Sequence, residues 1–161
     1  MSTSTYDPAD ADLSLAALFA GWAMADEIRR RLAAAGNADI RVADGVVFQH
    51  LVAAPQPIGA LAGRLGVSQQ ATSKSVADLE RRGYVRRTTD PGDARARIVR
   101  LTARGEAVID EGRRARAALV AELTAELGPR RAEAARRFLV DVVERLGADE
   151  PIRRRRVRPP A

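Results

Sequence analysis

The segment that decides the fold spans residues 58–85 and reads IGALAGRLGVSQQATSKSVADLERRGYV. Apolar residues at helical spacing predict a short helix over residues 58–65 and a second helix from Gln69 to about Arg82. Between them, Gly66-Val67-Ser68 predicts a tight turn in which Ser68 caps the second helix. Two short helices joined by a turn of a few residues that contains glycine are typical of a helix-turn-helix.

The period of the sequence changes after Gly83. Residues 84–88 and 97–101 alternate in the manner of short strands, and the TDPGDA segment between them has the composition of a turn. A hairpin directly after a helix-turn-helix predicts a winged helix, which we place at about residues 42–101, with its first helix at 42–53.

Long helices are predicted on both sides of the winged helix. Residues 12–35 and 103–146 show helical spacing of apolar residues, with a break at Gly128-Pro129. The expected fold is therefore mainly α: a winged helix-turn-helix with a two-stranded wing and long N- and C-terminal helices, in a single domain over residues 12–147. We expect a disordered leader over residues 1–11 and a disordered basic tail over residues 148–161.

Composition excludes several classes of protein and site. The 161 residues include no cysteine and one histidine, which rules out disulfides, thiol chemistry, a cysteine zinc site and a multi-histidine metal site within one chain. No apolar run reaches the roughly 18 residues of a membrane helix, and the first ten residues lack the pattern of a secretory signal. We expect a cytoplasmic protein without a metal or other cofactor.

The net charge of +6 is unevenly distributed. Residues 58–104 carry 10 basic and 4 acidic side chains, residues 151–161 carry 5 arginines and no acid, and the remainder is acidic. A compositional bias towards arginine explains why 26 of the 27 basic residues are Arg, but it does not explain where they cluster. The basic block within the winged helix predicts a surface that meets phosphate.

The same residues resemble the MarR (multiple antibiotic resistance regulator) family. The helix-turn-helix similarity runs from Leu61 to Val85, DPGDAR at 90–95 resembles the wing signature of the family, and LTARG at 101–105 resembles its Leu-Thr-x-x-Gly exit. The resemblance covers about residues 12–147. It implies a homodimer joined by the helices at 12–35 and 103–146, with one winged helix per half-site of palindromic DNA and, in many members, a small anionic or phenolic effector.

The helix that follows Ser68 is expected to enter the major groove. Glutamine pairs with adenine, lysine donates to guanine acceptors and serine serves either base, although Gln70 and Ser73 are equally candidates for phosphate contacts. A solvated polar face is the alternative, and Thr72 is expected to point inward. The candidate contacts on this segment are Ser68, Gln69, Gln70, Ser73 and Lys74.

Within the wing, Arg95 is the candidate for insertion into the minor groove, where the negative potential is concentrated. Asp93 has the wrong charge for DNA and is expected to hold Arg95 through an ion pair; an ordinary turn with an incidental pair is the alternative. Arg86, Arg87 and Arg97 are expected to add phosphate contacts without specificity.

Trp22 and His50 are the candidates for an effector pocket, against the alternative that both are core or dimer-packing residues. The arginine-rich tail is either a second contact to DNA or a solvated appendage. An enzyme is disfavoured, because the chain has no glycine-rich phosphate loop and no nucleophile elbow. The predicted function is a DNA-binding transcriptional regulator: a homodimeric repressor released by an effector or, alternatively, a constitutive or architectural DNA-binding protein without a ligand.

Overall fold

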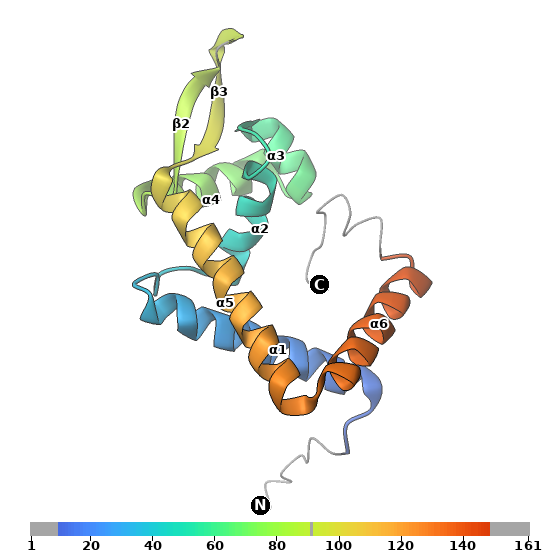
Figure 1. The fold of residues 1–161 in the computed structure, drawn as a ribbon. Coiled ribbons are helices and arrows are strands. Elements are labelled where there is room, and N and C mark those ends of the chain that lie inside the picture. Colours follow the sequence, from blue (N-terminus) through green and yellow to red (C-terminus); the bar gives the residue numbers. More distant parts are fainter. Residues whose placement is uncertain (1–9, 91, 149–161) are drawn as a thin grey trace, which may run out of the picture.

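The computed structural model describes residues 10–90 and 92–148, and within the wing residues 93–96 are described by their backbone only. Helices form most of this part of the chain (Figure 1). In chain order the elements are α1 (Leu13–Ala34), α2 (Val42–Leu51), β1 (Gln56–Pro57), α3 (Ile58–Leu65), α4 (Gln69–Arg81), β2 (Val85–Asp90), β3 (Asp93–Leu101), α5 (Ala103–Leu127) and α6 (Pro129–Arg145). The predicted leader and tail fall largely outside the described residues, at 1–9 and 149–161.

The helix-turn-helix forms where the sequence predicts it. α3 ends at Gly66, which has a φ of 64°, a left-handed conformation that glycine adopts without steric cost. Ser68 then caps α4, since its Oγ accepts a hydrogen bond from the N–H of Ala71 at 3.1 Å. Thr72 is buried and donates to the carbonyl of Ser68 at 3.1 Å, so its predicted inward orientation is confirmed.

The wing differs from the prediction in its length and in its number of strands. β2 and β3 continue past the predicted ends of both strands, with the last pairing between Asp90 and Asp93. The sheet has three strands in the order β1-β3-β2, because Gln56 pairs with Val99 in an additional short strand. A strand of two residues that contains a proline has no periodicity to detect, and it forms only because tertiary packing brings it beside β3.

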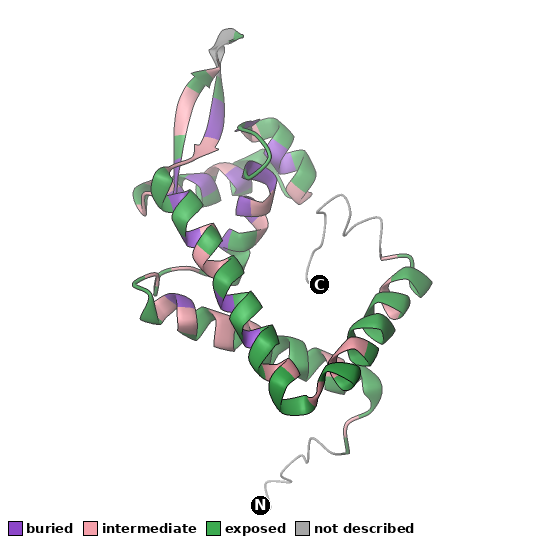
Figure 2. Cartoon of the chain, viewed as in Figure 1, coloured by how far each residue is buried: buried purple, intermediate pink, exposed green. Residues whose placement is uncertain are grey.

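The hydrophobic core of the chain lies inside the winged helix. Leu61, Val76, Tyr84 and Val99 are completely buried where α2, α3, α4 and the sheet meet the first half of α5. In Figure 2 the buried residues accordingly gather around these elements. This core positions α4 and the wing relative to each other.

α1 and α6 differ from the core elements, because many of their large apolar side chains are exposed, whereas α5 buries Val108, Ala115 and Leu119. α6 begins at the far end of α5, stands apart from the winged helix and has no buried residue (Figures 1 and 2). The helices predicted at these positions are confirmed, but most of the apolar stripes of α1 and α6 are not covered by the described part of the chain. The large exposed side chains on α1 and α6 include Leu15, Leu18, Phe19, Trp22, Phe138, Leu139 and Leu146. Within the described part of the chain, no helix is both long and apolar enough to cross a membrane.

Candidate nucleic-acid interface

The first two turns of α4 present a polar face opposite the core. Thr72, Val76 and Leu79 point inward, which leaves Gln69, Gln70 and Lys74 exposed and Ser73 half-buried. Because α4 begins here, its unpaired N–H groups and the positive end of its dipole add to the attraction for phosphate. The structure thus brings together all of the recognition-helix residues that the sequence singles out.

The side chain of Gln69 is close to α3. A Cβ atom at Gly59 would lie 3.0 Å from Nε2 of Gln69, so the two helices approach closely at this point. The missing side chain at Gly59 therefore leaves room for Gln69 at the start of α4. The spacing of residues along the sequence does not reveal this contact.

The three wing arginines that the sequence assigns to phosphate contacts, Arg86, Arg87 and Arg97, occupy different environments. Arg86 pairs with Arg100 in the strand register and Thr89 pairs with Arg97, so Arg86 and Arg97 lie on opposite faces of the wing. Arg97 is exposed and shares the face of Arg87. Asp93 and Arg95 lie within β3, and their side chains are outside the described part of the structure.

Arg87 has partners on α4 among the described residues. Its guanidinium donates to the carbonyl of Ser73 at 3.0 Å, and its main-chain N–H donates to Oε1 of Glu80 at 2.8 Å. Both partners belong to α4. The sequence assigned Arg87 to phosphate, whereas the structure places its side chain between the wing and α4.

The C-terminal end of α4 is held by a buried ion pair that the sequence analysis missed. Arg82 donates two hydrogen bonds to Asp44 of α2, both at 2.9 Å, and lies 2.8 Å from Asp78. The hydrogen bonding with Asp44 raises the pKa of Arg82, against the opposing effect of burial. Burial acts to raise the pKa of Asp78, but the charge of Arg82 and its hydrogen bond to this carboxyl help to outweigh burial and lower the pKa.

Tyr84 continues this network towards α5. Its hydroxyl donates to Oδ1 of Asp39 at 2.6 Å, which lowers the pKa of that carboxyl, and burial raises the pKa of Tyr84 itself. Arg104 donates to the same hydroxyl at 3.1 Å and stacks 4.4 Å from the ring centroid. The packed ring and its polar tip therefore connect α4, the loop before α2 and the start of α5.

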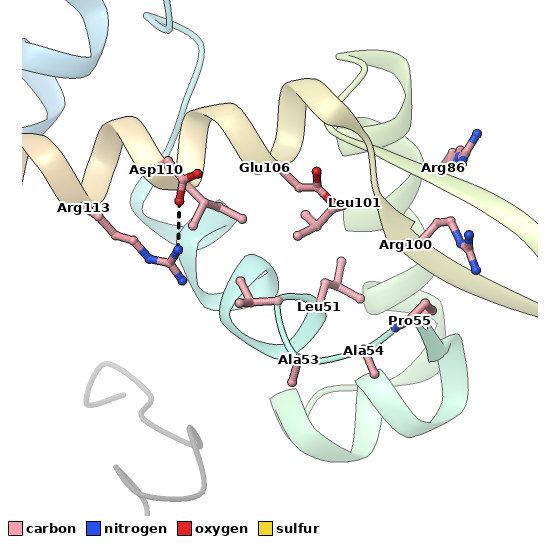
Figure 3. Close-up of a pocket in the computed structure, with 12 residues that line it drawn as sticks. Leu51, Ala53, Ala54, Pro55, Arg86, Arg100, Leu101, Glu106, Asp110 and Arg113 are labelled. Carbon is pink, nitrogen blue, oxygen red and sulfur yellow. Dashed lines mark hydrogen bonds and ion pairs between the residues drawn. The ribbon is translucent and has the colours of Figure 1, made fainter.

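A cavity of about 540 Å³ lies between the first half of α5, the end of α2 with the loop that follows it, and the base of the wing (Figure 3). Arg86 and Arg100 border it on the wing strands and Glu106, Asp110 and Arg113 on α5, where Asp110 and Arg113 are paired at 2.8 Å. The lining residues are Leu51, Val52, Ala53, Ala54, Pro55, Arg86, Arg100, Leu101, Glu106, Ile109, Asp110 and Arg113.

The two predicted effector residues lie elsewhere. His50 is buried in α2 with 2 % of its surface exposed, and Trp22 is 61 % exposed on α1, where its ring packs 5.8 Å from that of Phe19. Neither residue lines the cavity.

Comparison with known proteins links the winged helix to transcriptional regulators. Residues 40–96 match the family model described as MarR family. No curated protein sequence matches the chain significantly.

Three solved structures illustrate the likeness. A transcriptional regulator from Thermotoga maritima, Tm0710, is 27% identical, with a TM-score of 0.58 over 84% of this chain and 96% of its own. RV1404 from Mycobacterium tuberculosis is 21% identical, with a TM-score of 0.72 over 88% and 97% of the two chains. The transcriptional repressor CouR, bound to a 23-mer DNA duplex, is 24% identical, with a TM-score of 0.63 over 88% and 99%.

Helix-turn-helix, wing and exposed recognition face together define a winged-helix DNA-binding protein. With the match over residues 40–96 and the shared fold of the flanking helices, the chain is similar to MarR-family transcriptional regulators.

Proposed function

We propose that this protein is a homodimeric repressor that binds a palindromic operator through α4 and the wing. The observation that carries the proposal is the exposed polar face at the start of α4, held in place by the core on its other side. CouR, which has the same fold, is a transcriptional repressor bound to a DNA duplex, which supports this reading. A two-fold dimer would present two copies of α4 to two related half-sites.

Selection of duplexes from a random library by the full-length chain tests the proposal. We expect a palindromic consensus whose half-sites are about one helical turn apart. Recovery of no preferred sequence would contradict the proposed function.

Lys74 provides a test of base reading. Lys74→Ala is expected to weaken binding to the selected duplex by about 1–3 kcal/mol, because an exposed lysine in the second turn of α4 reaches guanine acceptors. Fluorescence anisotropy with the selected duplex and a scrambled one of equal composition measures this loss. Arg130→Ala, which removes the same charge from α6, is the control. An equal loss on both duplexes would mean that Lys74 contacts phosphate only.

The dimer is proposed from the apolar stripes of α1 and α6. Their large hydrophobic side chains are uncovered in the single chain, and a second copy buries them by the same area-dependent free energy that forms a core. In such a dimer, α1 and α6 of the two copies would interlock and cover each other's apolar side chains.

A charged substitution on this surface tests the dimer. Leu139→Glu places a carboxylate on α6 at a residue that is 48% exposed in the single chain. Because burial of an unpaired carboxylate costs several kcal/mol, we expect dimer affinity to fall by about tenfold or more in sedimentation experiments. Val42→Glu, at a 70% exposed position on the winged helix, should leave it unchanged. A dimer of normal stability in Leu139→Glu would place the interface elsewhere.

We also propose that the cavity between the wing and α5 binds the effector, an organic anion or phenol. Leu51, Leu101 and Ile109 supply apolar surface for a ring. Arg86 and Arg100 line the same cavity, and their positive charge would attract an anionic or phenolic oxygen. A panel of substituted benzoates and phenols, tested for release of the selected duplex, separates this proposal from the constitutive alternative, which predicts no release.

A further inference from the structure

The edge of the wing is covered by the recognition helix. β2 is an outer strand, because the sheet order is β1-β3-β2, and the outward N–H groups of an outer strand lack a neighbouring strand. At Arg87 this N–H donates instead to Oε1 of Glu80 at 2.8 Å. Glu80 lies in the last turn of α4, so a side chain of α4 takes the place of the missing strand at this point.

The side chain of Arg87 makes a second attachment to the same helix. Nη2 donates to the carbonyl of Ser73 at 3.0 Å, while Nε lies 3.6 Å from Oε2 of Glu80, within ion-pair distance. Ser73 and Glu80 lie about two turns apart on α4, at about 3.6 residues per turn. One attachment uses the main chain of Arg87 and the other its guanidinium, and they meet different turns of α4, so together they fix the angle between β2 and α4, whereas a single one would leave the strand free to pivot.

We infer that Glu80 and Arg87 form a clamp that sets the angle of the wing to the recognition helix and thereby determines sequence specificity. The inference rests on the proposed function, since the angle matters when α4 and the wing contact DNA at once. Both are positioning residues, because they act on DNA through α4 and β2. The attachment at Ser73 also lies directly beside Lys74, a candidate for base reading.

The clamp is expected to affect specific and non-specific DNA differently. On the specific sequence, α4 and the wing must both fit, and a fixed angle removes the entropic cost of ordering the wing after α4 has bound. On random DNA, attraction between basic side chains and phosphate dominates and tolerates many orientations. The ratio of the two affinities therefore reports on the clamp, whereas a destabilised protein loses binding to both DNAs in parallel.

The test uses full-length variants, the duplex selected by the wild-type protein and a scrambled duplex of equal composition. Glu80→Ala is expected to bind the selected duplex about tenfold more weakly, equivalent to about 1.4 kcal/mol. It should bind the scrambled duplex as well as the wild type or slightly better, because the variant gains one net positive charge. Arg87→Lys keeps the charge but loses the planar fork, and it should lose specificity in the same way.

Three further variants separate the clamp from general effects. Glu80→Gln keeps an oxygen for the Arg87 N–H and should restore most of the specificity. Glu111→Ala breaks an exposed ion pair with Arg114 on α5 and gains the same charge, and it should not lose specificity. Arg97→Ala removes an exposed wing charge and should weaken both duplexes equally, lowering the salt slope by about 0.9.

Amide hydrogen exchange at Arg87 measures the clamp in the free protein. Glu80→Ala should accelerate exchange at this N–H by about tenfold or more, because its acceptor is lost. An unchanged exchange rate, or wild-type specificity in Glu80→Ala or Arg87→Lys, would overturn the inference. Failure of the wild-type protein to select any sequence would instead overturn the proposed function, and the exchange result would still decide whether the clamp exists.

Discussion

Replacing Gly105 with alanine is expected to destabilise the fold by about 3 kcal/mol or more, beyond the usual cost of an overpacked core. A Cβ atom there would lie 2.1 Å from the carbonyl oxygen of Tyr84 and 3.1 Å from Cδ2 of Leu101. The obstacle is backbone, so it cannot rotate away. The start of α5 is also fixed to this segment, since the Thr102 N–H donates to the Tyr84 carbonyl at 3.1 Å and its hydroxyl to that of Gly83 at 2.7 Å.

Thermal unfolding measures this cost, and a loss of that size lowers the midpoint by roughly 6–12 °C in a domain of this length. Gly112→Ala is the matched control on the same helix. A Cβ at Gly112 would have no described neighbour within 4 Å, so this variant should be neutral or about 0.5–1 kcal/mol more stable, because alanine favours helix. Equal midpoints for the two variants would refute a steric role of Gly105.

Arg82→Ala is the second change with a large expected effect, a loss of about 3–5 kcal/mol in the free energy of unfolding. Asp44 is buried, with 7 % of its surface exposed, and it would keep only the hydrogen bond from the N–H of Arg41. The variant thus leaves a buried carboxylate without its counter-charge. Because Arg82 directly follows α4, we expect the C-terminal end of α4 to loosen as well.

Chemical denaturation of Arg82→Ala beside Arg81→Ala gives the comparison. Arg81 pairs with Asp78 as well, but its side chain is 74% exposed, and an exposed pair contributes only about 0–1 kcal/mol. Replacing both buried partners, as in Asp44→Leu with Arg82→Met, should recover much of the loss, because no charge is then left unpaired. If Arg81→Ala and Arg82→Ala unfold at the same denaturant concentration, the buried ion pair stabilises the fold no more than the exposed one does.

The sequence predicts the local elements well because their signals are local. The apolar spacing, the Gly66 turn and the Ser68 cap all act within a few residues, and the structure has the corresponding helices at these positions. β1 was not predicted, since its formation depends on Val99, which is 43 residues further along the chain than Gln56. Gly105 is visible in the sequence as part of the LTARG motif. The reason that it must be glycine is not, because that reason is the close approach of the Tyr84 carbonyl from a distant part of the chain.

Some features of the candidate DNA-binding site can likewise be predicted from the sequence, and others cannot. Polar residues at the start of α4 follow from helical periodicity, because a helix with one buried face must expose the other. The pairing of Arg87 with α4 does not follow from it: the alternation of β2 says which residues share a face, but not what lies against that face. The composition of the chain also does not predict that a cavity lies beside Arg86 and Arg100, or that His50 does not line it.

The sequence by itself determined the order of the helices, the winged helix-turn-helix, the face of α4 that points outward and the concentration of positive charge around it. Only the tertiary structure decided that the stripes of α1 and α6 stay uncovered in one chain, that Asp44 and Arg82 meet inside it and that Glu80 and Arg87 join the wing to α4. The reason is physical: periodicity shows that a face is apolar or charged, while its partner is chosen by how distant elements pack.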